Sequence, residues 1–237
     1  MARGPDLSLK IDRLDFGGVP LFAGFALRVA AGETVALVGA SGVGKTTLLQ
    51  VLAGVETGFD GHVTVNGIAA DKAPVPGLVF QDARLLPWLT CAGNLRAVCP
   101  AADVERALAV VGLAGLGGAW PRQLSGGMQR RLGLARALVV NPGLVLLDEP
   151  FVSLDRAMVR ELQALVLGLI AQSAATAVLV SHDPGDAARL AHRVIVIAGR
   201  PVRIVADMVL DRDPARRTRA EIAAFEDRIE TAMEAAL

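Results

Sequence analysis

Cysteine is scarce in this sequence, and net charge is absent. Two cysteines in 237 residues are too few for a disulfide framework, and Cys91 and Cys99 match no zinc-binding spacing. We expect two reduced thiols. The 24 Lys and Arg residues balance 24 Asp and Glu residues. A neutral chain lacks the diffuse attraction to phosphate backbones on which nucleic-acid-binding proteins usually depend, so no nucleic-acid partner is expected.

The sequence also lacks a recognisable signal peptide and a convincing membrane span. The amino terminus carries charged residues from Arg3 to Asp12, with no apolar core between them. The segment Leu162–His182 has no formally charged side chain and is long enough to suggest a span, but polar residues interrupt it. We interpret Leu162–Ala171 as a helix and Ala177–Val180 as a buried strand. Any membrane association is therefore expected to come through a partner.

Short apolar runs alternate with helical patterns, which predicts an α/β fold with a mainly parallel sheet covered by helices. The expected strands of this sheet are Thr34–Val38, Gly77–Phe80, Leu144–Leu147, Ala177–Ser181 and Val194–Ile197. An N-terminal antiparallel β extension is expected from Leu7–Asp12, Phe25–Val29 and His62–Asn66.

The stretch between Phe80 and Asn141 contains helical patterns separated by Gly and Pro, among them Asp103–Val111 and Gly126–Val140. We expect a helical subdomain at about 82–140, inserted into an α/β domain that spans 1–212. The tail at 213–237 is charged and contains many alanines, and its segment Pro214–Ala236 is expected to form a surface helix.

The most informative motif follows the expected strand Thr34–Val38. It reads Gly39-Ala40-Ser41-Gly42-Val43-Gly44-Lys45-Thr46-Thr47, which is the spacing of a phosphate-binding P-loop. Glycines permit the sharp turn and a close approach of backbone N–H groups to an anion. The following helix, Thr46–Leu52, adds partial positive charge at its N-terminus. We expect Lys45 to reach the β- and γ-phosphates of a nucleoside triphosphate and Thr46 to bind Mg²⁺. A chance glycine turn is the alternative, which the strand before and the helix after disfavour.

Two carboxylates follow the expected strand Leu144–Leu147. Ligands of an open parallel sheet bind at the carboxyl ends of its strands. Asp148 therefore suits a role in holding Mg²⁺, and Glu149 suits a role in orienting or deprotonating an attacking water. A strand that merely ends in exposed acids is the alternative.

A second glycine-containing motif, Leu124–Gln129, opens a helix. Ser125 can cap this helix, and Gly126 and Gly127 leave N–H groups exposed at its positive end. Because glycines cost helix stability, an ordinary helix start does not explain them. The motif predicts a second phosphate-binding surface. Gln81 and His182 each follow an expected strand and would lie at the same edge of the sheet, although a lone Gln or His is more often structural.

Seven elements occur in one order: Phe16, the P-loop, Gln81, Leu124–Gln129, Asp148-Glu149, Ser153-Leu154-Asp155 and His182. This order resembles the nucleotide-binding subunit of an ATP-binding cassette (ABC) transporter, from about Leu7 to Val205. The resemblance implies a P-loop NTPase core, an ATPase activity, and ATP and Mg²⁺ as cofactors.

The resemblance also implies roles for individual residues. Two cassettes would pair head to tail as a homodimer, so that the P-loop of one and the signature residues Ser125, Gly126 and Gly127 of the other enclose each ATP. Phe16 would stack on adenine, and Gln81 would sense Mg²⁺ and the attacking water. Asp155 would couple the two sites, and His182 would contact the γ-phosphate.

Two further segments, Val79–Trp88 and Ala198–Val205, resemble the importers of nitrate, sulfonates, taurine and related solutes. That resemblance implies permease subunits, a solute-binding protein, and a peripheral position at the cytoplasmic face of the inner membrane for a chain that is soluble when isolated. Leu85–Trp88 is a candidate permease contact, with core packing of Trp88 as the alternative. A soluble ABC ATPase of repair, translation or cluster assembly is disfavoured, because the chain has neither a second cassette nor a long coiled-coil insertion. A catalytically dead cassette is disfavoured by the intact Lys45, Asp148, Glu149 and His182.

The sequence departs from the family pattern in four places. Phe16 stands where a tyrosine is usual, which keeps stacking and removes a hydroxyl. Val152 stands where a small residue is usual, and Arg130 where a glutamine is usual. The segment Asp82–Leu124, which would face the permease, is short.

Overall fold

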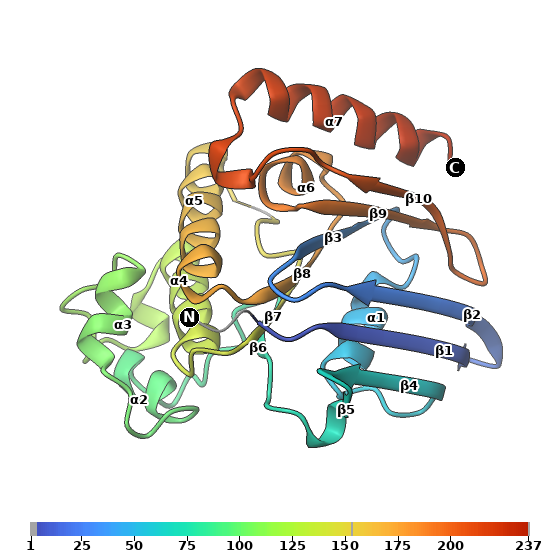
Figure 1. Ribbon diagram of the computed structural model, residues 1–237. Coiled ribbons are helices and arrows are strands. Elements are labelled where there is room, and N and C mark those ends of the chain that lie inside the picture. Colours follow the sequence, from blue (N-terminus) through green and yellow to red (C-terminus); the bar gives the residue numbers. More distant parts are fainter. Residues whose placement is uncertain (1–3, 153, 237) are drawn as a thin grey trace.

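The computed structural model describes residues 4–152 and 154–236 and is drawn as a ribbon in Figure 1. Arg3 and Ser153, which entered the interpretation of the sequence, lie outside the described residues. Within the described residues, one sheet has the strand order β10-β9-β3-β8-β7-β6. Its strands are β3 (Thr34–Val38), β6 (Gly77–Val79), β7 (Leu144–Asp148), β8 (Thr176–Ser181), β9 (Arg193–Ala198) and β10 (Arg203–Val209). All pairings in it are parallel except that of β10 with β9, so the predicted α/β architecture is confirmed.

The central strands are apolar on both faces because both faces are covered. In β3, Val35 and Leu37 belong to one hydrophobic core, whereas Ala36 and Val38 belong to another on the opposite side. The same alternation holds along β7, β8 and β9. Continuous apolar runs are typical of parallel strands buried in this way, which explains why the sequence located their ends to within one residue.

The first core lies between this sheet and a second, antiparallel one (Figure 1). The second sheet has the order β2-β1-β4-β5. Its strands are β1 (Leu7–Phe16), β2 (Val19–Val29), β4 (Asp60–Val65) and β5 (Ile68–Ala69), with the short 3-10 helix η1 (Ala70–Lys72) after them. Helix α1 (Lys45–Leu52) contributes Leu48, Leu49 and Leu52 to the same core. The predicted β extension is present, with β1 and β2 longer than predicted.

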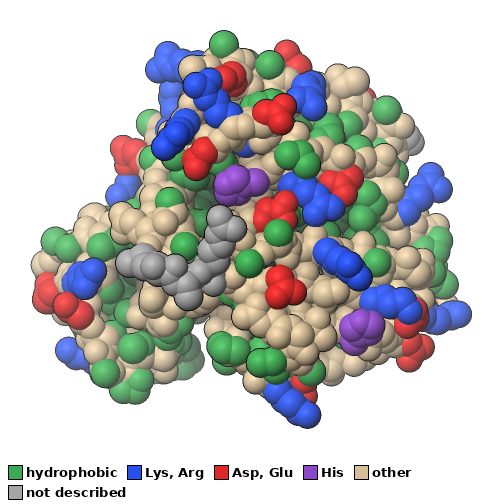
Figure 2. Space-filling view, viewed as in Figure 1, with side chains coloured by type: hydrophobic (Ala, Val, Ile, Leu, Met, Phe, Trp, Pro, Cys, Tyr) green, Lys and Arg blue, Asp and Glu red, His purple; other side chains and the backbone are tan. Residues whose placement is uncertain are grey.

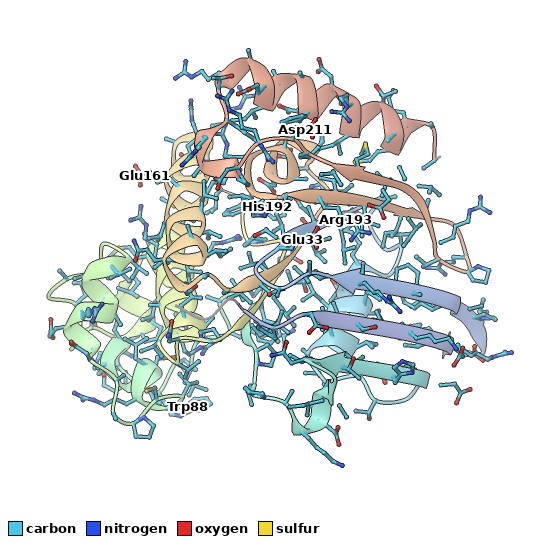
Figure 3. The ribbon with its side chains drawn as sticks, viewed as in Figure 1. Glu33, Trp88, Glu161, His192, Arg193 and Asp211 are labelled. Atoms are coloured by element: carbon cyan, nitrogen blue, oxygen red, sulfur yellow. The ribbon has the colours of Figure 1, made fainter. Side chains whose placement is uncertain are left out.

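Arg193 links the two sheets at their edge and is labelled in Figure 3. Its guanidinium donates to Asp207 on the neighbouring strand at 2.6 and 2.7 Å and to the carbonyl of Arg28 in β2 at 3.0 Å. The ion pair with Asp207 lowers the pKa of that carboxyl, with the hydrogen bond from Arg193 as the largest cause. One side chain thus fixes β2, β9 and β10 relative to one another.

A separate core holds together the helices between β6 and β7. They are α2 (Cys91–Arg96), α3 (Val104–Val110), the 3-10 helix η2 (Pro121–Gln123) and α4 (Gly126–Leu138). Cys91, Leu95, Leu108 and Leu132 are fully buried in this core. No strand interrupts the described residues from 80 to 143, as the sequence predicted.

Helices α5 (Arg156–Ser173), α6 (Pro184–Leu190) and α7 (Arg219–Glu234) cover the other face of the main sheet. The charge-free segment from 162 to 182 is indeed a helix leading into strand β8. The prediction placed the start of the last helix too early. Residues Pro214–Arg216 form the 3-10 helix η3, and Thr218 caps α7 by accepting a hydrogen bond from the backbone N–H of Glu221.

None of the helices in the described residues has the length and apolar character that crossing a membrane requires. On the face seen in Figure 2, basic and acidic side chains are interspersed, in keeping with the balanced charge of the sequence.

Candidate functional site

A cavity of about 520 Å³ opens at the carboxyl edge of the main sheet, where β3, β7 and β8 end. Ten of the predicted site residues line it: Phe16, Ser41, Gly42, Gly44, Lys45, Thr46, Thr47, Gln81, Glu149 and His182. They come from widely separated segments, and the parallel strand order brings them together. The Phe16 ring is 76% exposed at the rim of this cavity, where it is free to stack on a planar ligand.

The loop between β3 and α1 has the conformation that its glycines allow. Gly44 has φ 121°, which a residue with a side chain rarely adopts. A Cβ on Gly39 would lie 2.4 Å from the carbonyl oxygen of Ile197, so the strand can pass this point only without a side chain. Val43 is buried in the core between the two sheets and anchors the loop from below.

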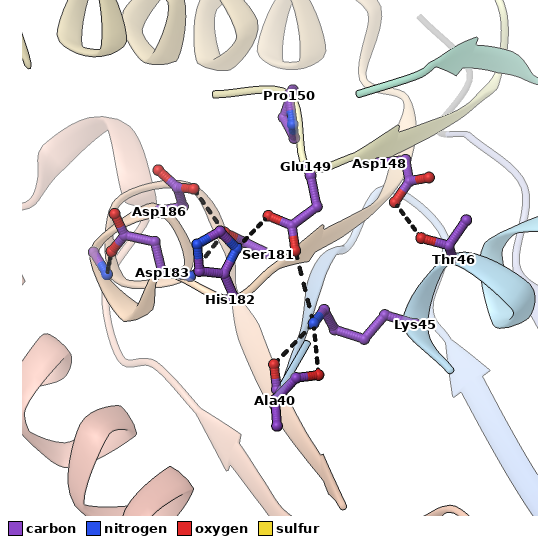
Figure 4. Close-up of polar contacts among 12 residues, drawn as sticks. Ala40, Lys45, Thr46, Asp148, Glu149, Pro150, Ser181, His182, Asp183 and Asp186 are labelled. Carbon is purple, nitrogen blue, oxygen red and sulfur yellow. Dashed lines mark hydrogen bonds and ion pairs between the residues drawn. The ribbon is translucent and has the colours of Figure 1, made fainter. Parts of the chain in front are cut away.

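Lys45 lies at the bottom of the cavity and is 5% exposed. Its Nζ donates to the carbonyl oxygens of Gly39 at 2.8 Å and Ala40 at 3.1 Å (Figure 4). Oε1 of Glu149 lies 3.7 Å from the same nitrogen. Burial lowers the pKa of Lys45, and the negative charge of Glu149 opposes this shift. The ammonium is thus held at the site by neighbours that a phosphate oxygen can replace.

Thr46 and Asp148 bring two oxygen ligands together. The hydroxyl of Thr46 donates to Oδ1 of Asp148 at 3.0 Å, across 102 positions of sequence. Burial raises the pKa of Asp148, while the hydrogen bond from Thr46 acts in the opposite direction. Mg²⁺ in phosphate-binding sites takes few protein ligands, since water and phosphate supply the rest. A hydroxyl and a carboxylate in contact at the edge of the cavity fit that donor set.

Glu149 connects the carboxyl ends of β7 and β8. Its backbone N–H donates to the carbonyl of Val180 at 3.0 Å, and its Oε2 lies 2.8 Å from Nδ1 of His182. Glu149 has φ 46°, in the left-handed region that a non-glycine residue seldom adopts. Strained backbone of this kind is concentrated at functional sites. The carboxylate of Glu149 points toward Lys45 and His182 (Figure 4).

The signature residues lie elsewhere on the same chain. Among the described residues, Ser125, Gly126, Gly127 and Asp155 are not part of the cavity lining. Ser125 caps α4 by accepting from the N–H of Met128 at 3.3 Å. A Cβ built on Gly126 would meet no atom within 4 Å, so this end of α4 faces open space. Gly127 is packed against Met158 of α5, and Asp155 caps α5.

Sequence reasoning missed part of the lining. Val19, Pro20 and Leu21 extend the wall that Phe16 begins, and Arg200 also lines the cavity. A guanidinium nitrogen of Arg200 donates to the carbonyl of Gly42 at 3.3 Å, across 158 positions. Val19, Pro20 and Leu21 are near Phe16 in the sequence, so the prediction for Phe16 indicated the right segment. Arg200 follows β9, whose carboxyl end adjoins that of β3, but its contact with the P-loop depends on a turn that periodicity does not reveal.

The sequence and the structure both match known proteins. The profile described as "ABC transporter" matches residues 22–152. The chain is 43% identical over 206 residues to the aliphatic sulfonates import ATP-binding protein SsuB 2 of Burkholderia lata, covering 84% of this chain and 76% of the relative. It is 40% identical over 235 residues to SsuB of Albidiferax ferrireducens, covering 96% and 83% respectively.

Among solved structures, the chain resembles the dimeric, post-hydrolysis state of the ATP-binding cassette MJ0796 bound to ADP and Pi. The TM-score is 0.75 at 25% sequence identity, over 87% of this chain and 100% of that one. These likenesses confirm the fold and the resemblance stated from the motifs. The chain therefore belongs to the ABC transporter family and is one of its ATP-binding, ATP-hydrolysing cassettes.

Proposed function

We propose that this cassette supplies the energy for a membrane importer of sulfonates or chemically similar small solutes such as nitrate and taurine. The observation that carries the proposal is the cavity in which Lys45, Thr46, Glu149 and His182 converge. Relatives named as ATP-binding proteins of aliphatic sulfonate import support the class of solute. A permease and a separate solute-binding protein would complete the importer. The cassette would then be a peripheral subunit at the cytoplasmic face of the inner membrane.

The residues of the cavity have distinct roles in this proposal. The Lys45 ammonium exchanges its backbone carbonyls for β- and γ-phosphate oxygens, and Phe16 stacks on adenine. Thr46, Asp148 and Gln81 are the residues that would hold Mg²⁺, which when bound neutralises phosphate charge. Glu149 accepts a proton from the attacking water as the water oxygen bonds to the γ-phosphorus. The bond from the γ-phosphorus to the bridging oxygen breaks, and ADP leaves with that oxygen. His182, held 2.8 Å from Glu149, donates to the γ-phosphate.

The exposed signature residues support a composite site between two copies of the chain. Ser125 and Gly126 present N–H groups at the N-terminus of α4, an end that favours anions. They lie outside the cavity of their own chain, so the phosphate that they bind belongs to a second cassette. ATP joins the two copies by contacting both, and its hydrolysis removes those contacts. The equilibrium between separate and paired cassettes shifts because the paired state has a different affinity for ATP than for ADP. Asp155, exposed next to this surface, would couple the two sites.

The surface beside Gln81 is the proposed contact with the permease. Arg136 holds the segment that follows Gln81 by donating to the carbonyls of Ala83 at 2.9 Å and Arg84 at 2.8 Å. The Trp88 side chain is 67% exposed, so its interpretation as core packing is wrong. Figure 3 shows Trp88 at the edge of the helical region.

The separate core of α2, α3 and α4 supports treating about 82–140 as a subdomain that moves against the rest of 1–212.

The test is co-purification of the tagged Glu149→Gln chain from detergent-solubilised native membranes with ATP present. We expect a multi-span permease in stoichiometric amount, identified by mass spectrometry. Trp88→Ala should reduce its recovery, whereas Trp120→Ala, at a less exposed tryptophan of the same region, should not. Recovery of soluble partners alone would overturn the transport function in favour of a soluble ABC ATPase.

A further inference from the structure

Asp186, on α6, is a carboxylate that the described active-site chemistry does not use. It is 5% exposed, and each of its oxygens accepts one short hydrogen bond. The hydroxyl of Ser181 donates to Oδ2 at 2.7 Å, and the amide of Gln163 donates to Oδ1 at 2.7 Å. Figure 4 shows Asp186 close to Ser181 and His182. These contacts join the end of β8, the middle of α5 and the start of α6.

Burying this carboxylate is unfavourable in itself. Burial raises the pKa of Asp186 to about 6, the charges of Asp183 and Glu149 add to the shift, and the two hydrogen bonds oppose it. An apolar group of similar size would fill such a position at lower cost. A buried carboxylate that accepts a hydrogen bond at each oxygen, however, fixes its partners in one geometry. We therefore look for the role of Asp186 in the positions of the residues that it bonds, Ser181 and Gln163.

What it holds is the backbone on both sides of His182. The Ser181 hydroxyl that donates to Asp186 also accepts a hydrogen bond from the N–H of Asp183 at 3.0 Å. His182 lies between these two residues. Its imidazole is 49% exposed, and Nδ1 of the ring lies 2.8 Å from Oε2 of Glu149. The placement of the ring thus depends on the backbone to which it is attached.

We propose that Asp186 is a positioning residue for ATP hydrolysis, which acts through the Ser181 hydroxyl to hold His182 against Glu149. This inference rests on the proposed roles of His182 and Glu149. Gln163 adds helix α5 to the same network, since it lies on that helix and donates to Asp186. Helix α5 begins directly after Asp155. One buried carboxylate therefore anchors both the loop that carries His182 and the helix that starts at the surface proposed to meet the second cassette.

The first test compares single variants by kcat, KM, ATP affinity and unfolding midpoint. Ser181→Ala and Asp186→Ala should each lower kcat by about tenfold or more while KM changes by less than about threefold, because the contacts of Lys45 and Phe16 to ATP are kept. Ser181→Thr retains the hydroxyl and should retain native kcat. Gln163→Ala should lower kcat, whereas its control Gln172→Ala, exposed on the same helix, should not. If Asp186→Ala does not fold, Ser181→Ala and the isosteric Asp186→Asn still test the network.

The second test repeats Ser181→Ala and Asp186→Ala in a His182→Ala background. If they act through His182, each should change the residual kcat by less than about twofold there. An equal loss of kcat in both backgrounds would show an independent structural role and overturn the inference. A His182→Ala chain with native kcat would overturn the proposed role of His182 and this inference with it. Loss of kcat in His182→Ala with native kcat in the Asp186 and Ser181 variants would overturn this inference alone.

Discussion

Nδ1 of His182 lies 2.8 Å from Oε2 of Glu149, although 33 positions separate the two residues in the sequence. The other oxygen of the same carboxylate lies 3.7 Å from Nζ of Lys45. One carboxylate thus joins the P-loop, the end of β7 and the end of β8. Substitutions at these three side chains should alter the nucleotide site while leaving the sheet beneath it folded.

Lys45→Ala should weaken ATP binding by about 10- to 100-fold, the effect expected when a hydrogen bond to a charged group is lost. Isothermal titration calorimetry measures this directly. Lys72→Ala is the matched control, because Lys72 is an exposed lysine outside the cavity. Native ATP affinity in the Lys45→Ala chain would refute the P-loop assignment.

Glu149→Gln should lower turnover by about 10²- to 10⁴-fold, the usual contribution of general acid–base catalysis. The amide keeps the shape of the carboxylate and cannot accept the proton of the attacking water. ATP should therefore accumulate unhydrolysed in a dimer that size-exclusion chromatography detects. Glu230→Gln, at an exposed position on α7, should hydrolyse ATP normally. Near-native hydrolysis by Glu149→Gln would exclude Glu149 as the base.

Ser125→Arg should abolish ATP hydrolysis while the monomer still binds ATP. Ser125 is exposed and lies outside the cavity of its own chain, so an arginine there blocks only a second cassette. Loss of the helix cap should lower the free energy of unfolding by about 1 kcal/mol. Ala114→Arg, exposed in the same helical region, controls for added charge. Activity that survives Ser125→Arg would contradict the composite site.

Asp186→Asn should change the pH dependence of stability. The carboxyl of Asp186 has a pKa of about 6 in the folded chain against 3.8 for the ordinary group, so the folded state binds the proton more tightly. This carboxyl therefore favours the folded state most below pH 3.8, and that contribution is lost as pH rises to about 6. At 1.36 kcal/mol per unit, the loss approaches about 3 kcal/mol.

The asparagine cannot titrate, so its free energy of unfolding relative to the native chain should rise between about pH 4 and pH 6 and stay level above. Denaturant melts at several pH values measure the difference. Asp227→Asn changes an exposed carboxylate on α7 and serves as the control. Its free energy of unfolding should differ from that of the native chain by the same amount at every pH. A difference that is constant with pH would show that Asp186 does not titrate in this range.

The buried parallel strands were predictable because both of their faces are covered. Strand β10 was missed because it lies at the edge of the sheet and is largely exposed, and because Asp207 interrupts its apolar residues. Helix α6 was missed because it has seven residues and begins with Pro184 and Gly185, a pair that indicates a turn. Short elements of this kind are fixed by tertiary packing, which local patterns do not report.

The P-loop, Asp148 and Glu149 were predictable as a group because each follows a recognisable strand. Asp186 was not, since an acidic residue in a charged segment is usually on the surface. Only the fold brings Gln163 to it, from 23 positions away. Contacts between distant segments had no signal in the local pattern, and the same holds for the contact of Arg200 with the P-loop.

Strand β3 lies between β8 and β9, and both neighbours are encoded far downstream, at 176–198. During synthesis the P-loop therefore emerges more than a hundred residues before the strands that flank it. Until they arrive, β3 has neither of its hydrogen-bonded neighbours, and the edge at which ATP binds does not exist. Acquisition of ATP binding by a nascent chain should thus mark the completion of the sheet rather than the appearance of the glycine motif.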